Sequence, residues 1–462
     1  MFESDTEEPL DFTIQQLGPR KIASPYKAFR YISDGQRTLY YTLTGPSGEP
    51  PAQNPAEASY GFELAGPREK IYFDPSKTRC GIVTCGGLCP GLNNVIRAIV
   101  LQLYHHYGVR NIYGFQYGFE GLVPRYGHEA LILDHERVKN IHQQGGSILA
   151  SSRGPQPAEE MVDALERLNI QVLFCIGGDG TLRGAMSLCK EIQARNLKIG
   201  VIGVPKTIDN DIPYTSRTFG FETAYAIAAA AIRGAHVEAT GARNGIGLLK
   251  LMGRHAGFIA ANAVLASRDA NFVLVPEVPF ELGGENGLLP HLYRRLEARK
   301  HAVVVVAEGA GQNLMQSEEG GAGKDPSGNV RLKDIGVLLR DKISAYLKAM
   351  GMEFTMKYIE PSYLIRSAPP QANDALFAGI LGQMAAHAAM AGKTAMFVGY
   401  WNTQFTHVPI AAAVSSTRRL DPKGNFWENV IECTGQPRLM VNSPELLEPD
   451  RGSTLEGATT AV

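Results

Sequence analysis

A chain of 462 residues is long enough for two or three domains with well-buried cores. Apolar residues make up 44% of it and charged residues 20%, which excludes an intrinsically disordered protein. A formal net charge of −1 gives no electrostatic reason to expect nucleic acid or a membrane as a partner. Because residues 1–10 lack a signal-peptide pattern and no apolar window is long enough to span a bilayer, the expected location is the cytoplasm.

Residues 1–75 alternate short apolar stretches with proline-rich turns, and they are predicted to form an accessory segment without chemistry. Regular α/β organisation begins at residues 80–85, a predicted strand that ends in Gly86 and Gly87 and precedes a helix over 94–107. Glycines at such a turn can hold phosphate through consecutive N–H groups, or they can be purely architectural.

A second candidate phosphate ligand lies in the loop at residues 145–155. Arg153 stands in this loop, shortly before a predicted helix over 158–168. A guanidinium there can clamp phosphate oxygens, although a lone loop arginine is usually only solvated. Its role therefore depends on the motifs that follow.

The sequence Gly177-Gly178-Asp179-Gly180-Thr181 follows an apolar run at 172–176, which is the pattern of a buried parallel strand that opens into a turn. A helix should follow, with Thr181 capping its first turn. The glycines let a ligand approach the backbone, the helix N-terminus offers free N–H groups, and Asp179 can hold a divalent cation. These features predict a phosphate and magnesium site.

A second buried strand, residues 199–204, ends in Pro205-Lys206-Thr207-Ile208-Asp209-Asn210-Asp211. A cation, a hydroxyl and two carboxylates thus stand together at the carboxyl end of a strand, where open α/β sheets bind ligands. As turn formers and helix caps, the two aspartates Asp209 and Asp211 would be structural only. Lys206 beside them favours a catalytic site.

Together these two turns resemble the phosphofructokinase family. Met252-Gly253-Arg254, after a predicted strand at 247–251, resembles the MGR signature of that family, and residues 145–153 resemble its donor-phosphate pattern ending in Ser-Arg. The resemblance covers about residues 78–410. It implies two Rossmann-like three-layer α/β domains with a cleft between them, plus an N-terminal extension. The similarity is to the long-chain branch, which holds ATP-dependent enzymes of plants and trypanosomatids as well as diphosphate-dependent enzymes.

The resemblance implies a 6-phosphofructokinase, which uses magnesium to transfer the γ-phosphoryl group of ATP to the 1-hydroxyl of fructose 6-phosphate in glycolysis. It makes Asp209 the general base, supported by Asp211, with Thr207 and Arg254 around the transferring group, and it makes Asp179 the magnesium ligand. The residues expected to bind the donor are Gly86, Gly87, Arg153, Gly177, Gly178, Gly180, Thr181 and Lys206. Those expected to bind the sugar phosphate are Thr207, Asp209, Met252, Gly253, Arg254, Glu308, Lys357, Tyr363 and Arg366.

Residues 357–366 are predicted to be an extended segment broken by a proline, and they resemble the strand that binds the acceptor 6-phosphate. By that likeness Tyr363 and Arg366 bind phosphate, and Lys357 reaches into a neighbouring subunit. An exposed edge strand is the structural alternative. Gly245 departs from the classical bacterial pattern, which has a phosphate-binding arginine there, so the acceptor phosphate must be held somewhat differently. Glu277, at the end of a strand, is either structural or related to magnesium.

The donor is predicted from Gly180 and Lys206. Diphosphate users of the family typically carry Asp in place of this glycine, and a carboxylate there would crowd and repel the α-phosphate of a nucleotide. Diphosphate users also typically carry Lys at the position of Lys206, where classical bacterial ATP enzymes have Gly, so this chain mixes the two patterns. Lys206 is compatible with either donor and Gly180 is taken as decisive, so ATP is favoured and diphosphate is the alternative. A sugar-phosphate sensor would be expected to lose the base. NAD and lipid kinases share residues 177–181 but should lack the other signatures.

The predicted domain organisation is an accessory segment over 1–75, a donor-binding domain over 76–220 with 365–415, an acceptor-binding domain over 221–364, and a partly flexible C-terminal segment over 416–462. The resemblance further implies an allosteric homo-oligomer, a tetramer or a dimer. The six cysteines mostly stand in apolar runs, which predicts reduced core residues and not a metal site.

Overall fold

The computed structural model describes residues 11–42, 60–315, 323 and 331–443. The chain divides into two compact units. Unit 1 holds the described residues of 1–227, 321–331 and 362–419, and unit 2 holds those of 228–320, 332–361 and 420–462. The flexibility expected at the C-terminal end falls mainly on residues 444–462, which lie outside the described residues.

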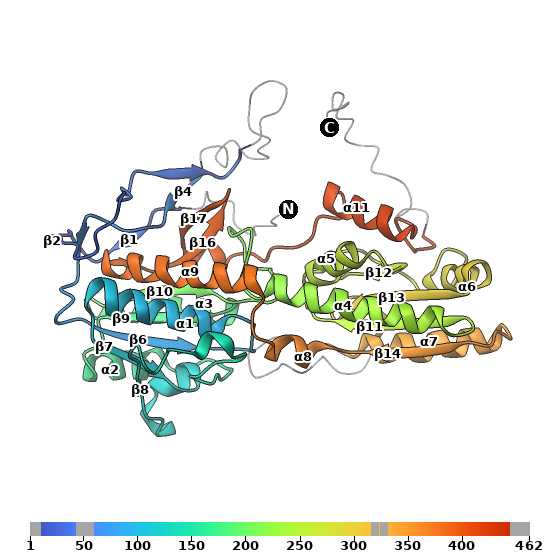
Figure 1. Ribbon diagram of the computed structural model, residues 1–462, viewed down its shortest axis with the longest axis horizontal. Helices are drawn as coiled ribbons and strands as arrows, with labels where there is room; N and C mark the ends of the chain where they lie inside the picture. The colour runs from blue at the N-terminus through green and yellow to red at the C-terminus, as the bar shows by residue number, and fades with distance from the viewer. Residues whose placement is uncertain (1–10, 43–59, 316–322, 324–330, 444–462) are drawn as a thin grey trace. The chain divides into compact units, whose positions relative to one another are not determined.

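Unit 1 is built on a sheet that has nine strands among the described residues, in the order β3-β4-β17-β16-β10-β9-β6-β7-β8 (Figure 1). Its five central strands are parallel to one another. They are β6 (Arg79–Thr84), β7 (Asn111–Phe115), β9 (Val172–Gly177), β10 (Gly200–Pro205) and β16 (Met396–Trp401). All residues of β9 and β10 are buried, as expected for parallel strands that are covered on both faces.

Antiparallel strands extend this sheet at both sides. One side adds β17 (Gln404–Pro409), β4 (Gly61–Leu64) and β3 (Arg37–Leu39), and the other adds β8 (Leu131–Ile132). The N-terminal segment thus contributes β3 and β4 directly to the main sheet. Two short antiparallel pairs complete the strands of the unit: β1 (Gln15–Gln16) with β15 (Lys393–Thr394), and β2 (Ile22–Ala23) with β5 (Lys70–Ile71).

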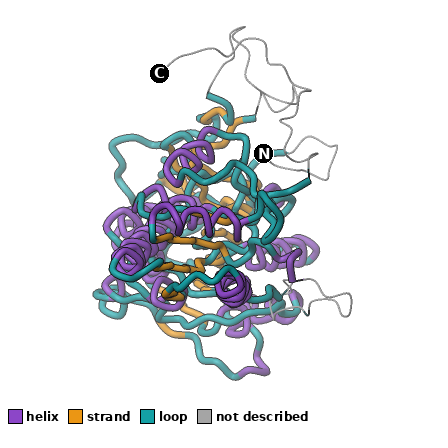
Figure 2. The backbone as a smooth tube through the Cα atoms, turned by 90° about the vertical axis from the view of Figure 1, so that its right-hand side faces the viewer, coloured by secondary structure: helices purple, strands orange, loops and turns teal. Residues whose placement is uncertain are grey.

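Helices pack against this sheet. Figure 2 shows purple helices around the orange strands of the chain. The chain passes from β6 through α1 (Leu92–Leu101) to β7 in one direction across the sheet, and from β9 through α3 (Asp179–Ala194) to β10 in the other. Because such crossovers are right-handed, α1 and α3 lie on opposite faces, and the strand order reverses between β6 and β9. Open α/β sheets bind their ligands at this kind of reversal, outside the carboxyl ends of the strands.

The other helical elements of unit 1 pack around this frame. The helix α1 continues as a π-helix, η2 (Gln102–Tyr107), and packs along α9 (Ala372–Met390). The helix α3 packs against α2 (Ala158–Arg167) and α10 (Ile410–Ala413). Short 3₁₀ turns occur at η3 (Gly118–Leu122), η4 (Pro124–Tyr126) and η5 (Ile141–Gln143).

Unit 2 has a parallel sheet with four strands among the described residues, in the order β12-β13-β11-β14. They are β11 (Gly245–Leu251), β12 (Phe272–Leu274), β13 (His301–Ala307) and β14 (Thr355–Ile359). Its core is formed by apolar residues of these strands and of the helices α6 (Leu288–Arg299) and α7 (Ile335–Ala349). The remaining elements are α5 (Phe258–Ser267), η6 (Gln312–Met315) and α11 (Asn425–Thr434); α4 (Phe221–Thr240) begins in unit 1 and ends in unit 2.

The segment expected to be extended over 357–366 is extended only in its first part, so that prediction was wrong beyond Ile359. The strand β14 ends there, and Ser362–Ser367 forms the short helix α8. Pro361 explains the change, because proline cannot donate to a sheet ladder and its fixed φ suits the start of a helix. Tyr363 and Arg366 therefore lie on a helix of unit 1, whereas Lys357 lies on a strand of unit 2.

Two further expectations concern the described residues as a whole. All six cysteines are free, and Cys80, Cys85, Cys89 and Cys175 are buried, which confirms that these four belong to the core. Within the described ranges, no helix combines the length and the apolar character that crossing a membrane requires.

Candidate functional site

Three of the turns singled out in the sequence follow neighbouring strands of unit 1. Gly86 follows β6, Gly178 follows β9 and Lys206 follows β10, and these strands are adjacent and parallel. Their carboxyl ends therefore meet at one edge of the sheet, beside the reversal of strand order. Backbone hydrogen bonds hold them there: Cys85 N–H donates to Ile176 O at 3.0 Å and Lys206 N–H donates to Gly177 O at 2.9 Å.

The turn after β6 is lined by two cations. Gly86 has φ +83°, a left-handed conformation that glycine adopts without strain, and its N–H donates to Ser152 O at 2.9 Å. A Cβ atom on Gly86 would lie 3.2 Å from Lys206 Nζ, and one on Gly87 would lie 3.5 Å from Arg153 Nη2. The structure thus brings Lys206 and Arg153 to the same glycine turn, although the two residues are far apart in sequence.

Lys206 is a buried cation: its exposed fraction is 6%, and its ammonium group donates to the carbonyl oxygen of Gly87. Burial lowers the pKa of Lys206, and the positive charges of Arg366 and Arg153 act in the same direction. A buried cation without a nearby carboxylate partner is costly. An anion at this turn would offset that cost, which is the electrostatic condition for a phosphate site.

The turn after β9 differs from the expectation in one respect. The helix α3 begins at Asp179 with Gly178 as its N-cap, so Thr181 lies inside the first turn and is not the cap. Thr181 is buried instead against Gly177, where an added Cβ would lie only 2.0 Å from its Oγ1. This close approach explains the glycine at 177. Gly180 has no atom within 4 Å of an added Cβ, so it faces open space.

Asp179 is the predicted magnesium ligand. In the structure its carboxylate forms an ion pair with Arg183, one turn further along α3, and 47% of its side chain is exposed. An acidic residue in the first turn of a helix also interacts favourably with the helix dipole. Within the described ranges, no cluster of three or more His, Cys, Asp or Glu side chains could hold a metal. Asp179 thus offers a single, partly exposed carboxylate, and its role as a magnesium ligand stays a prediction.

Thr207 organises the turn that carries the two candidate catalytic carboxylates. Its hydroxyl donates to Asp211 Oδ1 at 2.7 Å and accepts a hydrogen bond from the N–H of Asp209 at 3.2 Å. Its carbonyl oxygen accepts from the hydroxyl of Thr218 at 2.7 Å. One threonine thus holds both aspartates in a defined order.

Asn210, between the two aspartates, was not singled out in the sequence. It has φ +57°, a left-handed conformation that asparagine tolerates better than most residues. Asn210 is buried, with an exposed fraction of 3%, and its Oδ1 accepts a hydrogen bond from the N–H of Thr218 at 3.0 Å. The buried Asn210 side chain therefore stabilises the turn through its hydrogen bond with Thr218.

Unit 2 holds the other predicted residues. Met252 and Glu308 follow the paired strands β11 and β13, and the N–H of Glu308 donates to Leu251 O at 2.8 Å. Gly253 has φ +125°, and the N–H of Gly309 donates to its carbonyl oxygen at 3.1 Å. Met252 is fully buried. The structure therefore places the Met-Gly-Arg turn beside Glu308 at the carboxyl edge of this sheet, while their roles toward the sugar stay predictions.

The remaining acceptor residues are more exposed. Tyr363 on α8 has an exposed fraction of 80%, and Lys357 is exposed on β14, which is an edge strand of the unit 2 sheet. Glu277, which the sequence left undecided, accepts hydrogen bonds from the N–H groups of Gly257 at 3.0 Å and Leu420 at 2.9 Å. These bonds favour a structural role for Glu277.

The N-terminal segment carries a buried ionic network that the sequence did not reveal. Lys393, which is fully buried, lies 3.0 Å from Asp34 Oδ1 and 2.9 Å from Glu63 Oε1. Arg68 contacts the same two carboxylates, and His407 Nδ1 lies 2.8 Å from Glu63 Oε1. The antiparallel pairing of β4 with β17 sets Glu63 opposite His407, and Lys393 comes from β15, so the network depends on segments that are far apart in the sequence.

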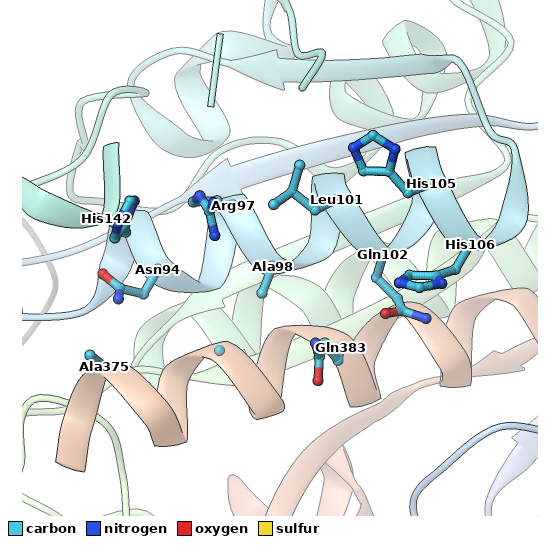
Figure 3. A pocket seen from close by; sticks show the side chains of 11 residues that line it. Asn94, Arg97, Ala98, Leu101, Gln102, His105, His106, His142, Ala375 and Gln383 are labelled. Carbon is cyan, nitrogen blue, oxygen red and sulfur yellow. The ribbon is translucent and has the colours of Figure 1, made fainter. Parts of the chain in front are cut away.

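A cavity of about 480 Å³ lies elsewhere in unit 1, between α1, η2 and α9 (Figure 3). Arg97 and His142 stand near one end of its wall, His105 and His106 near the other, and Gln383 of α9 faces them. None of the predicted site residues lines it. The cavity is therefore separate from the phosphate turns.

Unit 1 is thus an α/β unit with its polar turns at the reversal of strand order, and comparison with known proteins gives the family. A model of the phosphofructokinase family matches residues 79–389. An ATP-dependent 6-phosphofructokinase of Borreliella burgdorferi is 48% identical over 444 residues, which cover 94% of this chain and 99% of that protein. One of Trypanosoma brucei brucei is 45% identical over 440 residues, which cover 94% and 89%. The chain belongs to the phosphofructokinase family.

Two further comparisons widen this picture. The Arabidopsis thaliana protein named ATP-dependent 6-phosphofructokinase 5, chloroplastic, is 43% identical over 412 residues, which cover 88% of this chain and 76% of that protein. Among solved structures, the pyrophosphate-dependent phosphofructokinase of Marinobacter aquaeolei has a TM-score of 0.64 at 21% identity, covering 79% of this chain and 92% of that one. Such a low identity shows the fold alone, and it confirms the α/β fold expected from the sequence.

Proposed function

We propose that this protein is an ATP-dependent 6-phosphofructokinase, which transfers the γ-phosphoryl group of ATP to the 1-hydroxyl of fructose 6-phosphate. The observation that carries the proposal is the convergence of Lys206, Arg153, the glycine turns and the Thr207–Asp211 turn at one edge of the unit 1 sheet. The relatives at 48% and 45% identity, which bear this name, support it.

Phosphoryl transfer of this kind needs in-line positioning, charge neutralisation and a base, and no covalent intermediate. Asp209 accepts the proton of the 1-hydroxyl as the oxygen attacks the γ-phosphorus, and Asp211 keeps Thr207 in place. The bond from the γ-phosphorus to the bridging oxygen breaks and ADP leaves, while Lys206 and Arg153 neutralise charge on the transferring group and on the β-phosphate oxygens of ADP. Magnesium, bound through Asp179, would add further neutralisation of the phosphate oxygens. Arg254, Met252, Gly253, Glu308, Lys357, Tyr363 and Arg366 are proposed acceptor ligands on the family resemblance.

ATP is the proposed donor because Gly180 leaves open space at the start of α3. A nucleotide carries an α-phosphate that needs such space, whereas diphosphate does not. Diphosphate stays the second candidate, since Lys206 would serve either donor and one solved structure of the same fold is named pyrophosphate-dependent. The resemblance also supports three further proposals. The protein acts in glycolysis in the cytoplasm, it is an allosteric enzyme, and it forms a homo-oligomer, either a tetramer or a dimer.

The test is fructose 1,6-bisphosphate formation by the purified protein with magnesium and fructose 6-phosphate, with ATP and diphosphate assayed in parallel. Product with ATP alone is the expected result. If product forms with diphosphate alone, the donor is diphosphate and not ATP, and the proposed acceptor chemistry still holds. No product with either donor would contradict the proposed function.

A further inference from the structure

The turn that carries Asp209 and Asp211 is hydrogen-bonded through its carbonyl oxygens to Arg418, which is more than 200 positions away in the sequence. The N–H of Arg418 donates to the carbonyl oxygen of Asp211 at 2.8 Å. Its guanidinium Nη1 donates to Ser216 O at 2.9 Å and also lies 3.4 Å from Asn210 O. Arg418 thus contacts both ends of the loop that follows the catalytic carboxylates.

Resting on the proposed function, we infer that Arg418 is a positioning residue, which holds the Asp209–Asp211 turn in its catalytic geometry by binding the backbone carbonyl groups behind it. All of these contacts lie within unit 1. Arg418 donates to carbonyl oxygens of the turn, so it acts through the backbone that carries the aspartates.

The loop needs such support because its backbone is unusual. Asn210 and Tyr214 both have left-handed φ values, +57° and +58°. Non-glycine residues in this region cost of order 1 kcal/mol or more each, and they persist only where the surroundings impose them. The Asn210 side chain supplies one constraint through Thr218. Arg418 supplies the other, because its planar fork can satisfy several carbonyl groups at once.

The charge of Arg418 also matters. Burial lowers the pKa of Arg418 to about 10, while Asp211 and Tyr40 act in the opposite direction. The group therefore stays protonated at neutral pH and places a buried positive charge next to the catalytic turn. A neutral side chain that cannot reach would leave the carbonyl group of Asn210, a buried residue, without this donor, and it would leave the carbonyl group of Ser216 with only the longer bond from Asn210 Nδ2 at 3.4 Å.

The experiment compares Arg418→Gln and Arg418→Lys with Arg419→Gln, whose side chain is exposed and immediately adjacent. In Arg418→Gln we expect kcat to fall about ten-fold or more with the KM for ATP changed by less than about three-fold, because small misplacements of a catalytic group act on the transition state. Arg418→Lys, which keeps the charge, should be intermediate, and Arg419→Gln should match the wild type.

A second measurement keeps the inference testable without activity. Amide hydrogen exchange of residues 207–218 should become faster in Arg418→Gln, while exchange in β9 and β10 stays as in the wild type and Arg419→Gln shows no change. Unchanged exchange in this segment, or a wild-type kcat in Arg418→Gln, would overturn the inference. If Arg418→Gln does not fold, Arg418→Lys decides: wild-type kcat and wild-type exchange in that variant would reduce Arg418 to a stability role. An inactive wild type would contradict the proposed function instead, and the hydrogen-exchange data would still show whether Arg418 holds the turn in place.

Discussion

Asp209 is the residue on which the proposed chemistry depends most directly. We expect Asp209→Asn to lower kcat by about 10²-fold or more, with a modest change in the KM for fructose 6-phosphate, because the amide keeps the shape and loses the base. The hydrogen bond from the Asp209 N–H to Thr207 does not involve the side chain, so the turn should survive. Steady-state kinetics of the pure variant check this, and turnover like that of the wild type would remove Asp209 as the base.

Gly180 offers a test of donor choice at a single position. Open space around it means that Gly180→Asp should fold, and an acidic residue near the start of α3 is compatible with the helix dipole. We expect the ratio of kcat/KM with ATP to kcat/KM with diphosphate to fall by about ten-fold or more, because a carboxylate repels the α-phosphate. Gly180→Asn, which has the same size without the charge, is the matched control. An equal loss with both donors would contradict the electrostatic argument.

At the scale of elements, the buried network between β4, β17 and the N-terminal segment joins distant parts of unit 1. Lys393→Met removes one of the two cations shared by Asp34 and Glu63, the other being Arg68, and leaves the buried carboxylate of Glu63 with less compensating charge. Removing one partner of a buried ion pair costs about 3–5 kcal/mol, so the free energy of unfolding in urea should fall by that order. Lys198→Met, at an exposed lysine, is the control and should change little. Equal stability of the two variants would contradict a structural role for the network.

His387 on α9 gives the same unit a dependence on pH. Burial, with positive charge from His106 and Arg68, lowers the pKa of His387 to about 3, and the hydroxyl of Tyr107 lies 2.7 Å from its Nδ1. The folded pKa lies below the ordinary value of about 6.5. The unfolded chain therefore binds the proton first, and stability is lost as the pH falls from about 6.5 toward the folded value.

We expect His387→Gln to reduce the loss of unfolding free energy between pH 7 and pH 5 by about 2 kcal/mol, the equivalent of 1.5 pKa units. Urea unfolding at the two pH values measures this. His105→Gln, at an exposed histidine of η2, should leave the pH dependence as it is in the wild type. An identical pH dependence in the wild type and His387→Gln would show that His387 is not the group responsible.

At the scale of the whole molecule, the cysteines report on how completely the described residues bury their cores. Cys80, Cys85, Cys89 and Cys175 are buried, and burial raises the pKa of each of their thiols. In the native protein at pH 8, an aromatic disulfide reagent should therefore leave these four unmodified, and all six should react in guanidinium chloride. Cys433→Ser should remove the fastest native reaction, since Cys433 is only partly buried. Rapid native reaction of more than two thiols would contradict this packing.

Local patterns in the sequence determined much of this protein. Apolar runs that end in glycine or in Pro-Lys-Thr located β9, β10 and their turns, because strand burial and turn chemistry act over a few residues. They also located the Met-Gly-Arg turn at the end of β11. The same local reasoning was wrong at Tyr363 and Arg366, where Pro361 starts the helix α8 and does not merely interrupt a strand.

Only the tertiary structure decided how these pieces meet. The fold buries Glu63 of β4 beside Lys393 of β15, 330 positions away, and the return of the chain after α10 brings Arg418 to Ser216, 202 positions away. Neither contact leaves a trace in short-range periodicity, because Glu63, Lys393 and Arg418 each resemble an ordinary surface charge in the sequence. Thr181 likewise became a buried contact of Gly177 and not a cap, since the start of α3 depends on where β9 ends in the sheet. The sequence therefore determined which chemical groups the site can use, and the packing of distant strands determined which residues hold them in place.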